Sequence, residues 1–263
     1  MTELYDHYFT SHEYDQRYPK PNRSTLKFLF EQGAGEARDI LDYGCGSGRY
    51  ALPLLQTTQS RLTCFDISSA AIAELSRFIQ DHPAAARVRL VAGHAERLDS
   101  LGDYDLVIML FGVLSHIGDR TARVAALQQL RRLMRPEGRL ILSVPSVFRR
   151  RPVELLKAHL LRTTGRARHT QKESGNIVFT RHIDRGPRQF FYHLYSVAGL
   201  RAELMEAGFR ITALAPESLL PEWMVTQSSW LGKVDEGLLP LLPAALGYGI
   251  RAVAVPTPSG PTR

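Results

Sequence analysis

A short segment of the chain combines an acidic residue with three glycines spaced two residues apart: Asp42, Gly44, Gly46 and Gly48. We predict a strand over residues 39–43 before the glycines and a helix over residues 47–55 after them. Glycine permits positive φ and lets a ligand approach the backbone, and the first N–H groups of a helix can face that ligand. A carboxylate at position 42 accepts hydrogen bonds from a cationic amino group and repels a pyrophosphate. The segment therefore predicts a site for a nucleoside cofactor that carries an ammonium group.

A second carboxylate follows at the spacing that a nucleoside site requires. The apolar run over residues 61–67 ends in Asp66 and Ile67, and Asp66 lies 18 residues after Gly48. A carboxylate there accepts hydrogen bonds from both ribose hydroxyls. This spacing alone also fits NAD, but dinucleotide-binding turns read G-x-G-x-x-G, and the third glycine here falls one residue early. An NAD-dependent oxidoreductase is therefore the less favoured alternative.

The acidic residue and the glycines resemble motif I of the class I S-adenosylmethionine (SAM) dependent methyltransferases, D/E-x-G-x-G-x-G, and the type 11/12 members in particular. The resemblance covers residues 38–145 closely and residues 196–255 loosely. It implies an α/β fold, with a Rossmann-like, mostly parallel sheet, helices on both faces and an inserted lid. It also implies SAM as the cofactor and SN2 methyl transfer to an O, N or S atom. The intact motif disfavours a noncatalytic relative.

The loop after the predicted strand at residue 88 departs from the family pattern. Where the family usually has G-D-A, this chain has Gly93, His94 and Ala95. The resemblance implies that His94 and Ala95 contact the adenine, because a neutral imidazole accepts a hydrogen bond through one nitrogen. A loop histidine without a ligand is the alternative.

Candidate catalytic residues follow two later strands. The apolar run over residues 104–114 is typical of a parallel strand buried on both faces, and Leu110 to His116 would lie at the ligand-binding edge of the sheet. We assign Leu110 to the cofactor and His116 as the candidate base, with a local hydrogen bond as the alternative for His116. Tyr192, His193 and Tyr195 lie on the second strand of a predicted hairpin, residues 176–183 and 188–195, and are candidates to orient the acceptor. The alternative is that these side chains only pack against their neighbours.

Aromatic residues gather near the N-terminus: Tyr5, Tyr8, Phe9, Tyr14 and Tyr18. In the resembled family a leading aromatic segment folds over the cofactor, and cation–π attraction to a sulfonium supplies a physical reason. We therefore include Tyr18 among the cofactor-binding residues. A hydrophobic cap over the sheet is the alternative.

The net charge of +7 is concentrated in one segment of the 263-residue chain. Residues 149–188 contain 11 Lys and Arg against three acidic residues. We predict an N-terminal lid and first helix (1–37), a SAM-binding core (38–147), a basic insertion or substrate lid (148–195) and the remainder of the sheet (196–263). The insertion mixes basic with apolar and aromatic residues, which favours a lid over a small-molecule acceptor. A tRNA methyltransferase of the wobble-uridine type is the alternative.

Cysteine content and the N-terminal sequence bear on location. The two cysteines, Cys45 and Cys64, fall in predicted buried positions and suggest no disulfide framework. The first residues carry no basic-then-apolar signal, and no apolar run is long enough to span a bilayer. We therefore expect a cytoplasmic protein without a membrane span. We expect no metal site, and the oligomeric state stays open.

Overall fold

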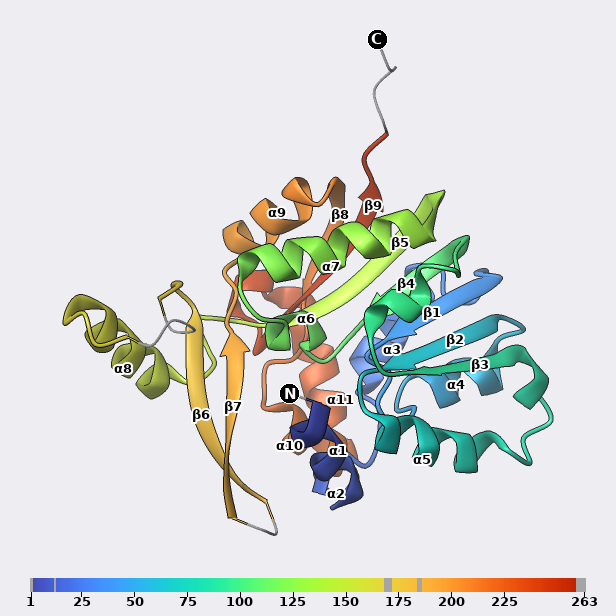
Figure 1. The fold of residues 1–263 in the computed structure, drawn as a ribbon, viewed down its shortest axis with the longest axis horizontal. Coiled ribbons are helices and arrows are strands. Elements are labelled where there is room, and N and C mark those ends of the chain that lie inside the picture. Colours follow the sequence, from blue (N-terminus) through green and yellow to red (C-terminus); the bar gives the residue numbers. More distant parts are fainter. Residues whose placement is uncertain (1, 12, 168–171, 184–185, 259–263) are drawn as a thin grey trace.

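The central feature of the fold is one seven-stranded sheet. The computed structural model describes residues 2–11, 13–167, 172–183 and 186–258. The strands follow the order β3-β2-β1-β4-β5-β9-β8 (Figure 1). Their bounds are β1 Asp39–Tyr43, β2 Arg61–Asp66, β3 Val88–Ala92, β4 Tyr104–Met109, β5 Met134–Pro145, β8 Phe209–Pro216 and β9 Gly249–Pro256. The first five strands pair in parallel, and β9 pairs antiparallel with both β5 and β8.

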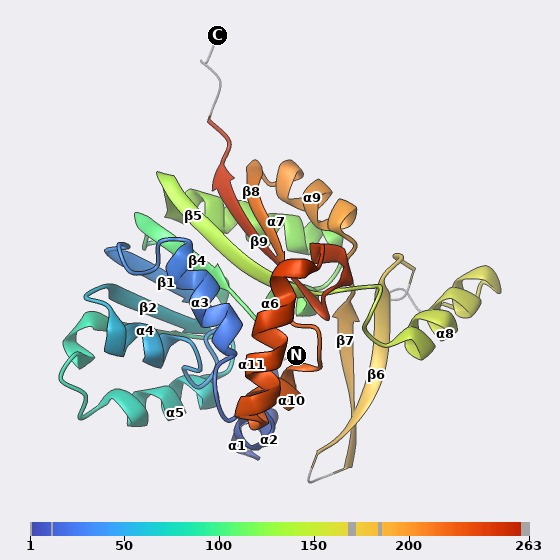
Figure 2. The same cartoon turned by 180° about the vertical axis from the view of Figure 1, so that it is seen from behind.

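Helices cover both faces of this sheet (Figures 1 and 2). One face packs against α6, α7 and α9, and its core includes Leu127, Leu130 and Leu204. The other face packs against α3, α4 and α5 through Leu29, Leu54 and others. The bounds are α3 Arg23–Glu31, α4 Ala51–Thr57, α5 Ser69–Ile79, α6 Val113–His116, α7 Arg120–Leu133, α9 Val197–Glu206, α10 Glu222–Gln227 and α11 Ser229–Leu238. The predicted α/β class, with its mostly parallel sheet, is confirmed.

Some predicted bounds are confirmed and others shift. Strands β1 and β6 (Asn176–Ile183) have the predicted bounds, whereas β4 ends at Met109 rather than at residue 114, and β7 covers Gly186–His193 rather than residues 188–195. Helix α4 begins at Ala51 rather than at residue 47. Residues 44–50 form turns instead, because Gly44, Gly46 and Gly48 all have positive φ. The glycine segment is therefore a longer loop than we predicted, and its amides do not belong to a helix.

An inserted unit projects from the sheet between β5 and α9. It comprises α8 (Pro152–Thr163) and the antiparallel hairpin of β6 (Asn176–Ile183) and β7 (Gly186–His193), at the edge of the molecule in Figure 1. Phe179 lies opposite Phe190, and Ile177 lies opposite Tyr192, so these four side chains share one face of the hairpin. The predicted turn between the strands includes Asp184 and Arg185, which lie outside the described residues, as does Arg168 of the basic segment.

The N-terminal helices α1 (Thr2–Thr10) and α2 (Glu13–Arg17) lie near the hairpin and α5 (Figure 2). The Asp6 carboxylate accepts hydrogen bonds from Ser68 Oγ (2.7 Å) and from the Ala70 amide (3.2 Å), and thereby fixes α1 to the start of α5. Within the described part of the chain, no helix has the length and apolar character needed to cross a membrane. The division of the chain into four segments stays a prediction.

Candidate active site

A cavity of about 330 Å³ lies at the carboxyl ends of β1, β2 and β4. This is the edge where the strand order reverses, between β1 and β4, and where open α/β sheets bind ligands. At one end, which we call the glycine end, the cavity is lined by Gly44, Gly46, Asp66, Ile67 and Leu110. At the other, the aromatic end, it is lined by α1 and the hairpin through Tyr5, Tyr8, Phe179, Arg181, Phe190, Tyr192 and His116.

Asp42 lies behind the glycine turn as a buried carboxylate, only 3% exposed. Its Oδ2 has no hydrogen-bond partner. Burial, together with repulsion from Asp66, raises the pKa of Asp42 to about 8. A buried carboxylate without a donor is costly, because it loses its hydration and gains nothing in return. Asp42 does not itself line the cavity, whereas Gly44 and Gly46 of the turn in front of it do.

Asp66 holds the turn in place and also lines the cavity. Its Oδ2 accepts a hydrogen bond from the Gly46 amide (2.9 Å), and its Oδ1 accepts one from the Ser68 amide (2.8 Å). The Ile67 amide also bonds to this carboxylate, which offers about four acceptor positions, so acceptor capacity remains for a ligand hydroxyl. Desolvation raises the pKa of Asp66, although these amides oppose the shift. The carboxylate therefore has both a structural partner and free acceptor capacity.

Gly46 marks the contact between the turn and the N-terminal helix. Its φ is +54°, and a Cβ at this position would lie 3.1 Å from Phe9 Cζ. From the sequence we expected a side chain here to intrude on ligand space. The structure shows that it would first meet the aromatic ring of α1. A larger residue would therefore displace α1 as well as narrow the cavity.

His116 lines the aromatic end and contacts two tyrosines. The Tyr5 hydroxyl lies 2.5 Å from His116 Nδ1, and the Tyr192 ring centroid is 4.2 Å from that of the imidazole. Burial, assisted by the positive charges of Arg181 and Arg150, lowers the pKa of His116 to about 3. The imidazole is therefore neutral near pH 7 and a weak base. Its geometry is suited to holding the Tyr5 hydroxyl.

Arg181, on β6, is the cation that lines the aromatic end. Its Nη1 donates to the Tyr8 hydroxyl (2.8 Å), and its guanidinium carbon lies 5.5 to 5.6 Å from the ring centroids of Tyr8, Phe179 and Phe190. The pattern of basic residues in the insertion did not single out this side chain. Only the hairpin register, which places Arg181 two residues beyond Phe179 on the same face, identifies it.

The other two predicted catalytic residues lie elsewhere. Successive side chains of a strand point to opposite faces, so Tyr192 reaches the cavity while its neighbour His193 faces away. His193 Nδ1 lies 2.6 Å from Asn176 Oδ1, and the Tyr195 hydroxyl donates to Glu203 (2.7 Å). Neither side chain lines the cavity, and this placement argues against the catalytic roles that we expected for His193 and Tyr195.

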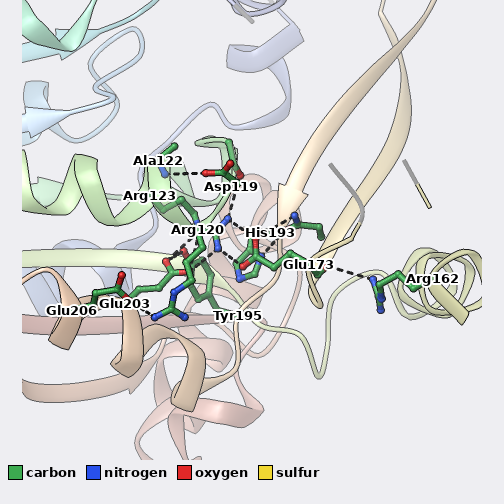
Figure 3. Close-up of polar contacts among 12 residues, drawn as sticks. Asp119, Arg120, Ala122, Arg123, Arg162, Glu173, His193, Tyr195, Glu203 and Glu206 are labelled. Carbon is green, nitrogen blue, oxygen red and sulfur yellow. Dashed lines mark hydrogen bonds and ion pairs between the residues drawn. The ribbon is translucent and has the colours of Figure 1, made fainter. Parts of the chain in front are cut away.

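These two residues belong to a buried polar network centred on Arg123 (Figure 3). Arg123 is fully buried and forms ion pairs with Glu173 (2.5 Å) and Glu203 (2.6 Å). The ligand atoms of Glu173, His193 and Glu203 lie within 4.8 Å of one another, a spacing that a metal ion could use. The Arg123 guanidinium already supplies the positive charge there. The network joins α7, α9 and the hairpin.

The remaining predicted cofactor residues fall into two groups. Ile67, Leu110 and Tyr18 line the cavity. His94 is exposed and Ala95 uses its carbonyl to accept a hydrogen bond from Gln129, and neither lines the cavity. An adenine contact by His94 and Ala95 therefore stays a prediction.

Residues 40–138 match the sequence model of a family described as a methyltransferase domain. These residues therefore carry the sequence pattern of a methyltransferase domain. In fold the chain resembles the SAM-dependent methyltransferase of Clostridium acetobutylicum ATCC 824, with a TM-score of 0.65 and 13% identity, covering 95% of this chain and 98% of the other. It also resembles the 1,6-didemethyltoxoflavin-N1-methyltransferase of Burkholderia thailandensis, solved with S-adenosylhomocysteine (SAH), with a TM-score of 0.61 and 20% identity, covering 98% and 91%.

A sequence relative matches a shorter stretch. The tRNA1(Val) (adenine(37)-N6)-methyltransferase of Shewanella putrefaciens (strain CN-32 / ATCC BAA-453) is 35% identical over 68 residues, which are 26% of this chain. The matched stretch spans only 29% of that relative's length. The similarity therefore concerns a part of each protein and does not identify a methyl acceptor for this chain.

Proposed function

We propose that this protein transfers a methyl group from SAM to an O, N or S atom of a small molecule bound at the aromatic end of the cavity. The observation that carries the proposal is the buried Asp42 carboxylate, whose Oδ2 lacks a donor beside a glycine turn. A SAM ammonium group suits this carboxylate in charge and in hydrogen bonding. The acceptor capacity that remains on Asp66 suits a ribose hydroxyl.

The residues of the chain then have distinct roles in the transfer. SAM supplies a methyl group already activated by its sulfonium, so the protein mainly has to align an acceptor lone pair and exclude water. The glycine turn, Asp42 and Asp66 orient the cofactor. The rings of Tyr5, Tyr8 and Tyr192 close the aromatic end against solvent. His116 is a positioning residue, because a pKa of about 3 suits it to fix the Tyr5 hydroxyl rather than to remove a proton at neutral pH.

The size of the cavity supports a small-molecule acceptor, and the two cysteines support a location in the cytoplasm. The aromatic end is bounded by α1 and the hairpin together, and the whole cavity measures only about 330 Å³. Such a space suits a compact molecule better than a polynucleotide. Both cysteines are free and buried, as in proteins of a reducing compartment.

Calorimetry with SAM, SAH and NADH tests the cofactor assignment directly. We expect SAM and SAH to bind with one-to-one stoichiometry and NADH not to bind, because the glycine turn lacks dinucleotide spacing. A methyl-release assay against pooled small metabolites, with purified tRNA in a parallel reaction, then tests the acceptor class. Binding of NADH without binding of SAM would overturn the proposal.

A further inference from the structure

Arg181 lacks the carboxylate partner of two buried arginines, Arg49 and Arg123; buried Arg251 also bonds to neutral oxygens, but it does not line the cavity. Arg49 pairs with Glu222 (2.7 Å), and Arg123 pairs with Glu173 and Glu203. Among the described residues, no carboxylate lies within 4.0 Å of the Arg181 guanidinium, which bonds to a neutral tyrosine hydroxyl instead. A half-buried guanidinium that faces a cavity therefore lacks the anionic partner that Arg49 and Arg123 have within the chain.

The other charges near the aromatic end do not neutralise Arg181. The guanidinium of Arg150 lies over the Tyr192 and Tyr248 rings and has the same sign, and His116 is neutral. Asp66 lies at the glycine end and bonds to backbone amides. The aromatic end therefore has a positive potential, whereas the glycine end has the acidic groups that suit a cationic cofactor.

The walls of the aromatic end restrict the body of the ligand. Phe179 and Phe190 stack with their ring centroids 5.7 Å apart, and Tyr8 meets Phe190 edge to face at 5.8 Å. Aromatic walls bind flat apolar groups by stacking and edge contacts. A guanidinium at the end of such walls forms charge-assisted hydrogen bonds with a planar anion, and a carboxylate fits its fork in two parallel bonds.

We infer that the methyl acceptor is a small aromatic acid whose carboxylate pairs with Arg181 while its ring lies between the hairpin and α1. This inference rests on the proposed function, because it assigns the acceptor of the same cavity. It makes Arg181 the residue that determines specificity, since neutral analogues of the same shape would leave the guanidinium without a partner.

Matched pairs of probes separate charge from shape. The protein is first saturated with SAH, and binding of 4-hydroxybenzoate is compared with that of 4-hydroxybenzamide by calorimetry, and indole-3-carboxylate with indole-3-carboxamide. For at least one pair we expect the acid to bind the wild type about 10-fold more tightly than the amide, or better. Arg181→Gln should remove this preference, and Arg181→Lys should retain part of it. SAH affinity should change by less than about 2-fold in both variants, since Arg181 lies away from the glycine end.

Arg188→Gln is the matched control. Arg188 lies directly opposite Arg181 in the hairpin register, is exposed and does not line the cavity, so its loss should leave the preference for acids intact. Equal binding of acid and amide, binding of no probe acid, or a preference that survives Arg181→Gln would overturn the inference. SAH binding in the same titrations reports on the proposed function separately, because only the failure of SAH to bind counts against the cofactor site.

Discussion

Asp42 connects the stability of the ligand-free protein to pH. Its pKa is raised from 3.8 to about 8, so the folded chain retains a proton that the unfolded chain releases between these values. The stabilising contribution of the protonated form is complete below pH 4 and is lost as the pH rises towards 8. A ligand ammonium group reverses this preference, since it pairs with the ionised carboxylate. Cofactor binding near neutral pH should therefore release a proton.

We predict that Asp42→Asn removes this proton release and weakens SAH binding by about 10-fold or more, because the amide has no charge to offer the ammonium group. Calorimetric titration of SAH at pH 7 in buffers of different ionisation enthalpy measures the proton. Asp39→Asn is the control, since Asp39 begins the same strand and pairs with Arg61 at the other end. Proton release that persists in Asp42→Asn would show that another group titrates.

The sequence predicted the placement of the residues at the glycine end of the cavity better than the placement of those at the aromatic end. Asp42, Asp66 and the glycines are close in sequence, and their spacing alone determines the geometry of a strand, a turn and the next strand. Which side chains line the aromatic end depends on the face of the hairpin that each residue occupies. A shift of one residue exchanges Tyr192 for His193, and composition does not determine that register. Arg181 was hidden among the many basic residues of the insertion for the same reason.

At the scale of elements, Arg123 joins the inserted hairpin to the sheet. It lies on α7, its partner Glu203 lies on α9, and Glu173 precedes β6. An arginine on a helix usually keeps its guanidinium in solvent, so nothing in the sequence indicated that Arg123 would be fully buried. Tertiary pairing explains the burial, because two carboxylates from distant segments satisfy the guanidinium.

We predict that Arg123→Leu lowers the free energy of unfolding by about 3 kcal/mol or more, because the buried Glu203 loses its cationic partner. Urea unfolding, followed by circular dichroism, measures this difference. Arg120→Ala is the matched control from the same helix, because Arg120 and Glu206 form a surface pair, for which we expect a loss below about 1 kcal/mol. Equal losses in the two variants would contradict the role assigned to the network.

At the scale of the whole molecule, substitution of the exposed basic residues tests the alternative that the acceptor is tRNA. Arg149, Arg150 and Arg151 are consecutive basic residues of the insertion, but Arg150 lies over the Tyr192 and Tyr248 rings, and Arg151 lies over Phe179. Their loss would disturb packing as well as charge. Arg149, Lys157 and Arg166 are exposed and form a cleaner set.

We predict that tRNA binds weakly, with a shallow dependence on salt, and that replacing Arg149, Lys157 and Arg166 by alanine changes this dependence little. Binding measured by fluorescence anisotropy from 50 to 200 mM salt gives the slope of log affinity against log salt. The control replaces three exposed arginines that lie outside the insertion, within residues 38–147: Arg77, Arg97 and Arg132. A steep slope that falls by about one unit for each lost insertion residue, and not in the control, would restore the tRNA alternative.

The place of β9 in the sheet has a consequence for the synthesis of the chain. This strand pairs with β5 on one side and β8 on the other, yet it is the last of the described strands of this sheet in chain order, and so it leaves the ribosome after its partners. Until then the nascent polypeptide exposes the open edges of β5 and β8, whose amide and carbonyl groups can pair with other chains. The core around β1 to β5 can form earlier, whereas the sheet is complete only after residues 249–256 have emerged. Slow translation or a premature stop within this last strand would therefore yield aggregation rather than a smaller folded protein.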